Sequence, residues 1–399
     1  MDALTYDQAP ALPMTTSSAV QPSVLIDASA LSSVAAKGGI GTYVRNLLAA
    51  LAADPGHGLG LNALVTADVH LDPAIGRRTI TRRIKSRPRI EVIEHAVRVP
   101  LDARRWRGEG EVFHNPGFHA PWGIQSPWVQ TLLDLIPLAV DEPDLQPLRQ
   151  RWQRFGPRYR NADAIIAISR HAADEGIHLL GLDAKRIHVA HLGVDPIFTP
   201  LGPDARPEGG AGGAGAEGEP PYLLVVAEYS RRKGFAQAFA VVSALADAGY
   251  PHVLKVAGQV HDFARPELEG LRAGAGRPER IEILGFVPDL AALYRQAEAV
   301  LVTSRYEGFG LPAVEAMASG VPVVAFENSA LTEVVTGGGW LVADGDVDAM
   351  VKAVRALLDS PDAAFEWRQK GLERAQHFTW SESAARHAEV YWSVAERRG

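Results

Sequence analysis

Residues 304–324, SRYEGFGLPAVEAMASGVPVV, form the most informative stretch of this sequence. After an apolar run, the stretch reads as a glycine-rich loop, a helix, a glycine stop and a further strand. Pro312 suits the first helical turn, where its missing N–H costs nothing, and Gly320 suits the C-terminal cap. The start of this helix therefore points free N–H groups and a positive dipole end toward an anion site.

Two glutamates flank the start of this helix: Glu307 lies in the loop and Glu315 in the first turns. Both can face one ligand, and a carboxylate is a good acceptor for the two hydroxyls of a diol. The simpler interpretation has the glycines as turns and both glutamates as solvated side chains. The glutamates, the glycine-rich loop, Pro312 and Gly320 occur together in the order that a loop–helix ligand site requires, and this favours a ligand site.

Two series of apolar, strand-like runs alternate with helical stretches, which predicts two halves built from parallel α/β units. The first series comprises residues 24–27, 61–65, 90–93, 128–133 and 164–168. The second comprises residues 222–226, 253–257, 281–284, 299–303 and 321–326. Open parallel sheets bind ligands outside the carboxyl ends of their strands, so two such halves are expected to enclose a cleft.

The domain boundaries are predicted from local composition. Residues 1–22 offer little to bury and predict a disordered N-terminal lead-in. Residues 201–220 hold a glycine-rich run between prolines and predict a flexible linker. The two α/β domains are therefore expected at 23–200 and 221–378. Residues 379–399 carry apolar side chains at helical spacing and predict a C-terminal amphipathic helix.

The overall composition is that of a globular protein, with 47% hydrophobic and 22% charged residues in a chain of 399. A formal net charge of −7 argues against a nucleic-acid partner held by bulk electrostatics. The lack of cysteine excludes a disulfide framework, a thiolate metal site and a cysteine nucleophile. No run of 18 apolar residues and no signal-peptide pattern is found, so the expected location is the cytoplasm.

The stretch around Glu307 and Glu315 resembles the Glu-x7-Glu signature of family 4 retaining glycosyltransferases of the GT-B fold. Four further segments are similar to this family: VAEYSRRKG at 226–234, ILGFVP at 283–288, LYRQA at 293–297 and FTW at 378–380. The glycine cluster GGIG at 38–41 resembles the glycine loop of the first domain. The resemblance covers most of residues 23–395 and implies two Rossmann-like, doubly wound domains that face each other across a cleft.

The resemblance also implies roles for individual residues. Residues 23–200 would bind the acceptor, 221–378 the nucleotide sugar, and the C-terminal helix would cross back to the first domain. Glu315 would bind the ribose hydroxyls and Glu307 those of the donor sugar. The remaining implied contacts are the base pocket (Phe286, Val287), backbone facing the phosphates or sugar (Gly308, Phe309, Gly310, Leu311) and the first-domain loop facing the diphosphate (Gly39, Ile40, Gly41).

Two cations precede Gly234, at the carboxyl end of a predicted strand. Arg232 and Lys233 are candidates to stabilise the charge that develops on the departing diphosphate. The alternative is an ordinary solvated charge run. The first-domain glycines have an alternative of the same kind, a simple strand-to-helix turn.

A third candidate lies in residues 130–138, QTLLDLIPL, which resemble the mannosyltransferase-like branch of the family. Leu133 stands where that branch usually has a histidine, so any role of that imidazole is in doubt here. Asp134 remains a candidate near the transferring sugar, with a structural turn as the alternative. The segment favours GDP-mannose as donor. His114 and His119, which follow the strand-like residues 111–113, are weaker candidates, because a lone histidine is more often structural or exposed.

Residues 344–348, DGDVD, invite a metal-site interpretation. An EF-hand loop needs glycine at its sixth position, where this sequence has Ala349. Because a predicted helix follows, turn and N-cap roles are favoured. We expect neither a metal nor another cofactor, with the nucleotide diphosphate sugar as a co-substrate.

Two regions are strongly basic. Residues 77–107 hold 11 basic and 3 acidic residues, a net charge of +8. The second region interleaves five arginines with aromatic residues and predicts a basic aromatic helix face: Arg149, Arg151, Trp152, Arg154, Phe155, Arg158, Tyr159 and Arg160. A solvated surface is one interpretation. A site for an anionic acceptor, or a peripheral contact with anionic lipid at the inner membrane face, is the other.

The function predicted from these residues is transfer of a hexose, best mannose from GDP-mannose, to a hydroxyl acceptor, with retention and without a metal. The acceptor would be a glycan, a lipid-linked molecule or a small molecule. The alternatives are a UDP- or dTDP-sugar donor, a pseudo-glycosyltransferase on the same fold, and a non-catalytic protein that binds nucleotide sugars or glycans.

Overall fold

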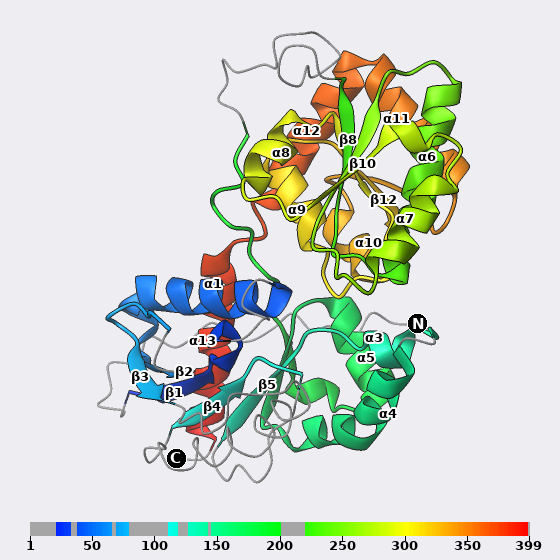
Figure 1. Ribbon diagram of the computed structural model, residues 1–399. Helices are drawn as coiled ribbons and strands as arrows, with labels where there is room; N and C mark the ends of the chain where they lie inside the picture. Colours follow the sequence, from blue (N-terminus) through cyan, green and yellow to red (C-terminus); the bar gives the residue numbers. More distant parts are fainter. Residues whose placement is uncertain are drawn as a thin grey trace. The chain divides into compact units, whose positions relative to one another are not determined.

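The computed structural model describes residues 21–32, 38–65, 69–79, 111–118, 127–142, 145–200 and 220–397. Several sequence predictions lie outside these residues: residues 1–20 of the lead-in, the linker residues 201–219, the strand at 90–93, His119 and the part of the basic region that follows residue 79. The chain divides into two compact units, Met1–Gly193 with Trp380–Gly399, and Val194–Thr379 (Figure 1).

The first unit contains a parallel sheet of seven strands in the order β3-β2-β1-β4-β5-β6-β7. The strands are β1 (Ser23–Asp27), β2 (Gly60–Val65), β3 (Gly76–Thr79), β4 (Val112–Asn115), β5 (Trp128–Leu132), β6 (Ala164–Ala167) and β7 (Ile187–Val189). The helices are α1 (Gly39–Ala53), α3 (Ile136–Ala139), α4 (Gln146–Phe155), α5 (Arg170–Leu180) and α13 (Trp380–Glu396). Short 3₁₀ turns include η1 (Ser29–Ser32) and η5 (Gly156–Asn161).

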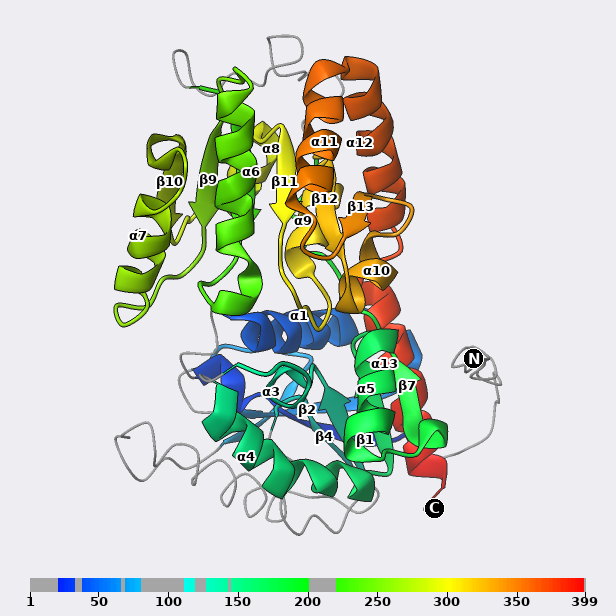
Figure 2. The same ribbon diagram turned by 90° about the vertical axis from the view of Figure 1, so that its right-hand side faces the viewer.

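Helices cover both faces of this sheet (Figure 2). Alternate strand residues point to opposite faces, so Leu25 and Phe113 pack in a core with Ala172 of α5 and Trp152 of α4. The opposite face carries His114 and Thr131, which bond to residues of α13 and α1. Both faces of a parallel sheet must be buried, and this arrangement satisfies that requirement.

The second unit contains a parallel sheet of six strands in the order β10-β9-β8-β11-β12-β13. The strands are β8 (Tyr222–Val226), β9 (Val253–Ala257), β10 (Ile281–Gly285), β11 (Ala299–Val302), β12 (Val323–Glu327) and β13 (Trp340–Ala343). The helices are α6 (Phe235–Asp247), α7 (Arg265–Ala273), α8 (Leu290–Gln296), α9 (Leu311–Ala318), α10 (Ser329–Val335), α11 (Val347–Asp359) and α12 (Pro361–Ala375). The 3₁₀ turn η7 (Arg231–Lys233) follows β8.

These topologies confirm the predicted fold class. Each sheet is doubly wound, with the first three strands in the order 3-2-1 and the next three in the order 4-5-6, as in Rossmann-like domains. In such a sheet the order reverses between the first and fourth strands, and ligands bind at that switch point. The switch points are β1/β4 in the first unit and β8/β11 in the second.

Three strands were not predicted: β3, β7 and β13. β3 and β7 are edge strands of three or four residues, too short for a periodic pattern. β3 includes Arg77, at the start of the basic region, so its sequence lacks the apolar pattern that would predict a strand. At 344–348 the N-cap prediction is confirmed, because Asp346 accepts a hydrogen bond from the Ala349 N–H at 2.8 Å. Among the described residues, no helix is both long and apolar enough to cross a bilayer.

The predicted basic aromatic helix face is wrong in part. Its residues are divided between α4 and η5, and Trp152 and Tyr159 point into the core rather than outward. Of the arginines, Arg149 donates to the carbonyls of α3 and its C-cap, Pro137 and Val140. Two aromatic residues of this segment, Trp152 and Tyr159, are therefore part of the core and not of the surface.

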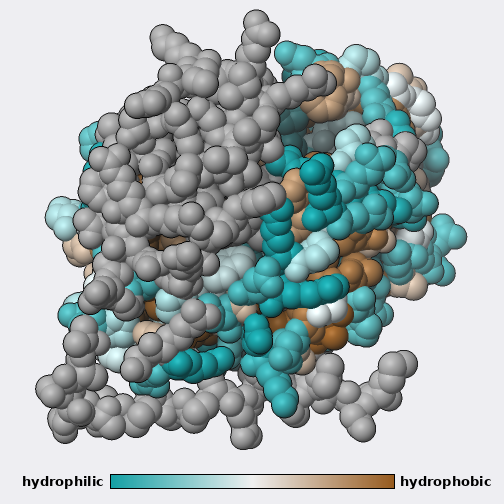
Figure 3. All heavy atoms as spheres, turned by 90° about the horizontal axis from the view of Figure 1, so that it is seen from below, coloured by the Kyte–Doolittle hydropathy of each residue, from teal (hydrophilic) through white to brown (hydrophobic). Residues whose placement is uncertain are grey.

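An exposed part of the same segment remains. Arg154 and Arg158 lie over the ring of Phe155, with guanidinium carbons 5.3 and 4.8 Å from its centre, and Leu148 is 44% exposed. Figure 3, a view from below the chain in Figure 1, shows hydrophilic residues with hydrophobic ones between them on the part that no grey atoms cover. Peripheral membrane contact and the cytoplasmic location both stay predictions.

A buried chain of hydrogen bonds attaches α13 to the first unit. His387 of α13 has Nδ1 2.6 Å from the Ser383 carbonyl, which can only accept. Nδ1 must therefore carry the proton, and because burial keeps this imidazole neutral at pH 7, Nε2 accepts from the Tyr43 hydroxyl at 2.7 Å. Because that hydroxyl has donated its only proton, it accepts from Thr131 at 2.9 Å.

The chain of hydrogen bonds continues through the sheet and returns to α13. The Thr131 hydroxyl, having donated to Tyr43, accepts from His114 Nε2 at 2.7 Å. His114 Nδ1 then accepts from the Tyr391 hydroxyl at 2.7 Å. One carbonyl thus sets the direction of five hydrogen bonds, and both histidines are neutral. His114, whose candidate role was weak, is a buried structural residue with 0% exposure.

This chain makes the stability of the first unit depend on pH. Burial lowers the pKa of His387 from 6.5 to about 4 and that of His114 well below 6.5, where the neighbouring His387 adds to the effect. As the pH falls from 6.5 toward 4, the unfolded chain takes up protons that the folded unit does not, so stability falls. His387 alone accounts for about 3 kcal/mol across this window.

We expect His387→Gln to have a shallower loss of stability than the wild-type chain between these pH values, because one proton uptake is removed. Urea denaturation at several pH values measures the slope. His178→Gln is the matched control, since His178 is exposed on α5, and it should keep the wild-type slope. Equal slopes for His387→Gln and wild type would contradict the assignment.

Candidate functional site

The cationic turn after β8 lies against the end of β11. Gly234, which ends η7, has φ +66, and a Cβ there would lie 2.0 Å from the Thr303 carbonyl oxygen, so only glycine fits. The two segments are also hydrogen-bonded. The Thr303 hydroxyl donates to the Lys233 carbonyl at 3.0 Å, and the Arg305 N–H donates to the Arg232 carbonyl at 2.8 Å. The loops that follow β8 and β11 are therefore in direct contact at the switch point of this sheet.

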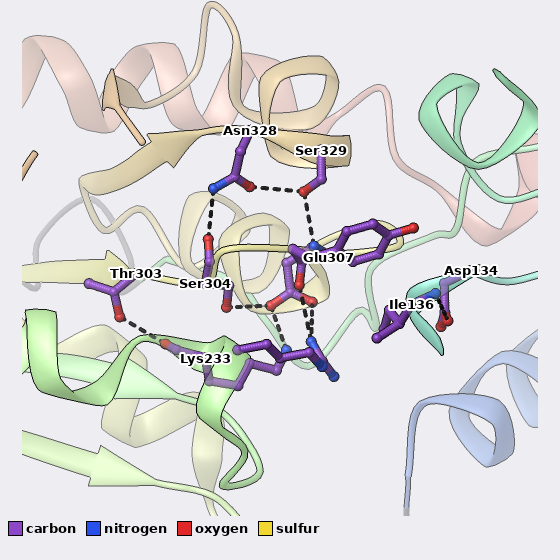
Figure 4. Close-up of polar contacts among 10 residues, drawn as sticks. Asp134, Ile136, Lys233, Thr303, Ser304, Glu307, Asn328 and Ser329 are labelled. Atoms are coloured by element: carbon purple, nitrogen blue, oxygen red, sulfur yellow. Dashed lines mark hydrogen bonds and ion pairs between the residues drawn. The ribbon is translucent and has the colours of Figure 1, made fainter. Parts of the chain in front are cut away.

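Glu307 lies at the centre of this contact and is 8% exposed (Figure 4). Its Oε1 accepts from Lys233 Nζ at 2.5 Å and from the Ser304 hydroxyl at 2.6 Å. Its Oε2 is 3.8 Å from Nη1 of Arg232, which also donates to the Tyr306 carbonyl at 3.0 Å. The structure thus brings together three predicted residues, Glu307, Arg232 and Lys233.

The charge of Glu307 follows from these contacts. Burial by itself would raise the pKa of the carboxyl group, but the charges of Lys233 and Arg232 and the hydrogen bonds from Lys233 and Ser304 outweigh it. The net result is a pKa below the usual value, so the group is ionised at neutral pH. A buried carboxylate with two cations at a switch point can fix the positions of both cations relative to a bound anion.

The glycine loop turns from Glu307 into α9. Gly310 precedes the helix with φ +100, and a Cβ there would lie 2.8 Å from Leu331 Cδ2. Phe309 is buried and packs edge-on against Phe378, with ring centres 5.5 Å apart. The predicted backbone positions Gly308, Phe309, Gly310 and Leu311 therefore form a tight turn whose aromatic side chain is buried in the unit.

Glu315 lies in the middle of α9, where its Oε2 accepts from the Tyr294 hydroxyl of α8 at 2.9 Å. Burial raises the pKa of Glu315 to about 7; the Tyr294 hydrogen bond opposes this, and the charge of Asp195 adds to it. Tyr294 is fully buried, and its own pKa is well above 10 because of burial and the charge of Glu315. Tyr294 therefore stays protonated and acts as the donor.

The other predicted residues follow the carboxyl ends of strands in their own unit. Phe286 follows β10, is 69% exposed, and precedes the partly buried Val287. In the first unit, Gly39, Ile40 and Gly41 form the first turn of α1 after β1, and a Cβ on Gly39 would meet nothing within 4 Å.

Asp134 follows β5 and accepts from the Ile136 N–H at 3.1 Å, so the turn role left open for it is present. The structure places these first-unit residues in a different unit from Glu307 and Glu315.

Four residues of this site were missed from the sequence: Tyr294, Ser304, Asn328 and Ser329. Asn328 and Ser329 directly follow β12, and Ser304 follows β11, so position at the carboxyl ends of adjacent strands was an available signal. Nothing in the sequence pairs Tyr294 with Glu315. Among the described residues, no group of three or more His, Cys, Asp or Glu side chains is arranged to hold a metal ion.

Two family models match the chain, one for each unit of the fold. The model "Glycosyltransferase Family 4" matches residues 37–198, and "Glycosyl transferases group 1" matches residues 213–374. Between them they span most of the chain. Two doubly wound parallel sheets together with these two family models make the chain a GT-B protein of the glycosyltransferase class. The chain belongs to the family 4 glycosyltransferases.

Individual relatives agree with this assignment. D-inositol 3-phosphate glycosyltransferase 1 of Catenulispora acidiphila is 34% identical over 248 residues, which cover 59% of this chain and 58% of the relative. A GDP-mannose-dependent α-(1-6)-phosphatidylinositol dimannoside mannosyltransferase of Mycobacterium tuberculosis is 36% identical over 147 residues, 36% of each chain. The matches thus span only part of the length of these relatives.

A solved structure supports the fold. Sucrose-phosphate synthase of Thermosynechococcus elongatus has a TM-score of 0.75 with 23% identity, covering 95% of this chain and 100% of that one. At this identity the likeness establishes the GT-B fold alone.

The Tyr294–Glu315 hydrogen bond gives a direct test of the site's electrostatics. Because the hydroxyl stabilises the carboxylate form, we expect Tyr294→Phe to raise the pKa of Glu315 above 7. Carboxyl ¹³C shifts of glutamate-labelled protein follow the titration. Tyr250→Phe is the control, since it removes an exposed hydroxyl bonded to Asp359 in the same unit. An unchanged or lower pKa in Tyr294→Phe would contradict this account.

Proposed function

We propose that this protein is a retaining glycosyltransferase that moves a hexose from a nucleotide diphosphate sugar to a hydroxyl acceptor. One observation carries the proposal: a buried Glu307 carboxylate paired with Lys233 and Arg232 at the β8/β11 switch point, within the glycine loop that precedes α9. A diphosphate leaving group needs cations that are already in place when its charge develops. The buried carboxylate keeps both cations there.

Each proposed role follows from the chemistry of the group. Lys233 and Arg232 stabilise the charge on the departing diphosphate, and the N–H groups at the start of α9 face the same anion. Glu307 accepts hydrogen bonds from hydroxyls of the donor sugar, and Glu315 from those of the ribose.

The other proposed contacts come from loops at the sheet edges. Gly39, Ile40 and Gly41 approach the diphosphate with their backbone, Phe286 and Val287 line the base pocket, and Asp134 lies near the transferring sugar.

Retention requires no covalent nucleophile in this proposal. The bond between the sugar's anomeric carbon and the diphosphate oxygen breaks, and the acceptor oxygen bonds to the same carbon on the same face. The departing diphosphate helps to take the proton of the acceptor hydroxyl. The protein supplies positioning and charge stabilisation. Two features of the described site support this assignment. The Glu307 carboxylate is already engaged by Lys233, Arg232 and Ser304, which makes it a poor nucleophile, and the two cations suit an anionic leaving group.

GDP-mannose is the proposed donor. Two observations support it: the resemblance of residues 130–138 to the mannosyltransferase-like branch, and the GDP-mannose dependence in the name of the Mycobacterium tuberculosis relative. The test is a screen of purified protein with GDP-, UDP- and dTDP-sugars for donor hydrolysis and transfer. Turnover of a UDP- or dTDP-sugar alone would contradict GDP-mannose as the donor and assign that nucleotide instead. Inactivity with all three would contradict the proposed glycosyl transfer.

With the donor found, removal of a site cation should lower turnover strongly. We expect Lys233→Ala to reduce kcat by about 100-fold or more, because one preorganised positive group is lost from the leaving diphosphate. Lys370→Ala is the matched control, since Lys370 also pairs with a glutamate, Glu366, at 2.6 Å but on an exposed part of α12. Its kcat should equal that of the wild type. A small effect of Lys233→Ala on kcat would contradict the proposed role of Lys233 in stabilising the leaving diphosphate.

We also propose that transfer needs no divalent metal, because Lys233 and Arg232 supply the positive charge at the diphosphate. Treatment with EDTA followed by removal of the chelate should leave the initial rate unchanged. Addition of Mg²⁺ or Mn²⁺ to the treated protein should have no effect either. A rate that falls on treatment and returns with the metal would contradict metal independence while leaving the glycosyltransferase assignment intact.

A further inference from the structure

Four residues form a closed ring of hydrogen bonds around Glu307 (Figure 4). The Glu307 N–H donates to the Ser329 hydroxyl at 2.9 Å, and that hydroxyl donates to Asn328 Oδ1 at 2.9 Å. Asn328 Nδ2 donates to the Ser304 carbonyl at 3.0 Å, and the Ser304 hydroxyl donates to Glu307 Oε1 at 2.6 Å. The ring therefore joins the backbone of Glu307 to its own carboxylate through three other residues.

The orientation of the ring is fixed from outside. Asn328 Nδ2 also donates to Asp344 Oδ1 at 2.6 Å. Because both acceptors require the amide nitrogen, the Asn328 oxygen must face Ser329. Ala330, next in α10, donates its N–H to the Glu307 carbonyl at 3.3 Å. The start of α10 thus holds both backbone groups of Glu307.

Ser329 has an unusual backbone conformation for this task. Its φ is +43, and among the described residues it is the one position other than glycine with a positive φ. Glycine adopts this conformation without strain, whereas a residue with a Cβ does not. What serine has and glycine lacks is the hydroxyl that receives the Glu307 N–H. Strain of this kind is typical of sites where one side chain is needed in one place.

We propose that Ser329 and Asn328 are positioning residues that hold the Glu307 carboxylate on Lys233 and Arg232. This proposal rests on the proposed function, since it assigns the ring to the same transfer reaction. Neither residue needs to touch the donor. Loss of the ring frees the loop to turn the carboxylate away, which leaves both cations less well placed when charge develops on the diphosphate. The effect should therefore fall on turnover.

Two variants of Ser329 separate the hydroxyl from the backbone strain. Ser329→Ala removes the hydroxyl and keeps the strain, whereas Ser329→Gly removes the hydroxyl and relieves the strain. We expect kcat to fall by about 10- to 100-fold in both, as for other losses of supporting contacts at a reacting group. GDP and UDP affinity should change by no more than about twofold. Ser329→Gly should have the higher Tm of the two.

Thr332→Ala is the matched control, because it removes a hydroxyl from the same helix, outside the ring. It should keep the wild-type kcat. The double variant Ser304→Ala with Ser329→Gly should lose less than the product of the two single losses, since both break one ring. A Ser329→Gly variant with full kcat and raised Tm would overturn the proposal, because it would leave Ser329 a purely structural role. Losses that multiply in the double variant would also overturn it.

The outcomes distinguish this proposal from the proposed function. If the wild-type protein transfers no sugar, the proposed function fails, and a crystal structure of Ser329→Gly still tests the ring. A Glu307 carboxylate that has left Lys233 in that crystal structure supports the positioning role. A carboxylate that is unmoved overturns it.

Discussion

The candidate site of the second unit depends on one buried interaction, the pairing of the Glu307 carboxylate with Lys233 and Arg232. A carboxylate with 8% exposure has lost most of its hydration, and only nearby positive charge and donors make its ionised form stable there. The cations and the carboxylate come from two loops, with Lys233 and Glu307 74 residues apart in the chain. They meet because β8 and β11 are neighbours in the sheet. The sheet order is therefore a condition for the site, and Gly234, packed against the Thr303 carbonyl, is the local requirement that lets the two loops touch.

The part of this arrangement that the sequence predicted was the part carried by local patterns. Pro312 and Gly320 delimit α9 as expected, and β8 and β9 have the predicted bounds. The strands β3 and β7 were missed, because edge strands of three or four residues hold too few side chains for a periodic signal. In α4 and η5 the alternation of arginine and aromatic residues predicts a basic aromatic helix face. Trp152 and Tyr159 are instead buried, because a large aromatic side chain stabilises the fold most when it is removed from water.

The candidate site divides in the same way. Glu307, Arg232 and Lys233 were predicted from position, and the structure places them in contact. Asn328 and Ser329 offered only the signal of their position after β12, because their bonds to the Glu307 loop join segments distant in sequence. Nothing in the sequence pairs Tyr294 with Glu315. Tyr294 and Glu315 illustrate the limit: the hydrogen bond joins α8 to α9 across 21 residues, and burial rather than residue type raises the pKa of the carboxyl group. A motif identifies a carboxylate, but the protein around it determines its charge.

The two glutamates are also tied to the points where the chain enters and leaves the second unit. Val194 donates its N–H to the Phe378 carbonyl at 2.9 Å, so the first and nearly the last residues of this unit are bonded to each other. Phe378 packs on Phe309, two residues after Glu307, and Phe198 packs edge-on against Tyr294, which holds Glu315. All four rings are buried. Each glutamate-bearing segment of the second unit is therefore packed, through one aromatic pair, against a residue close to where the chain enters or leaves this unit.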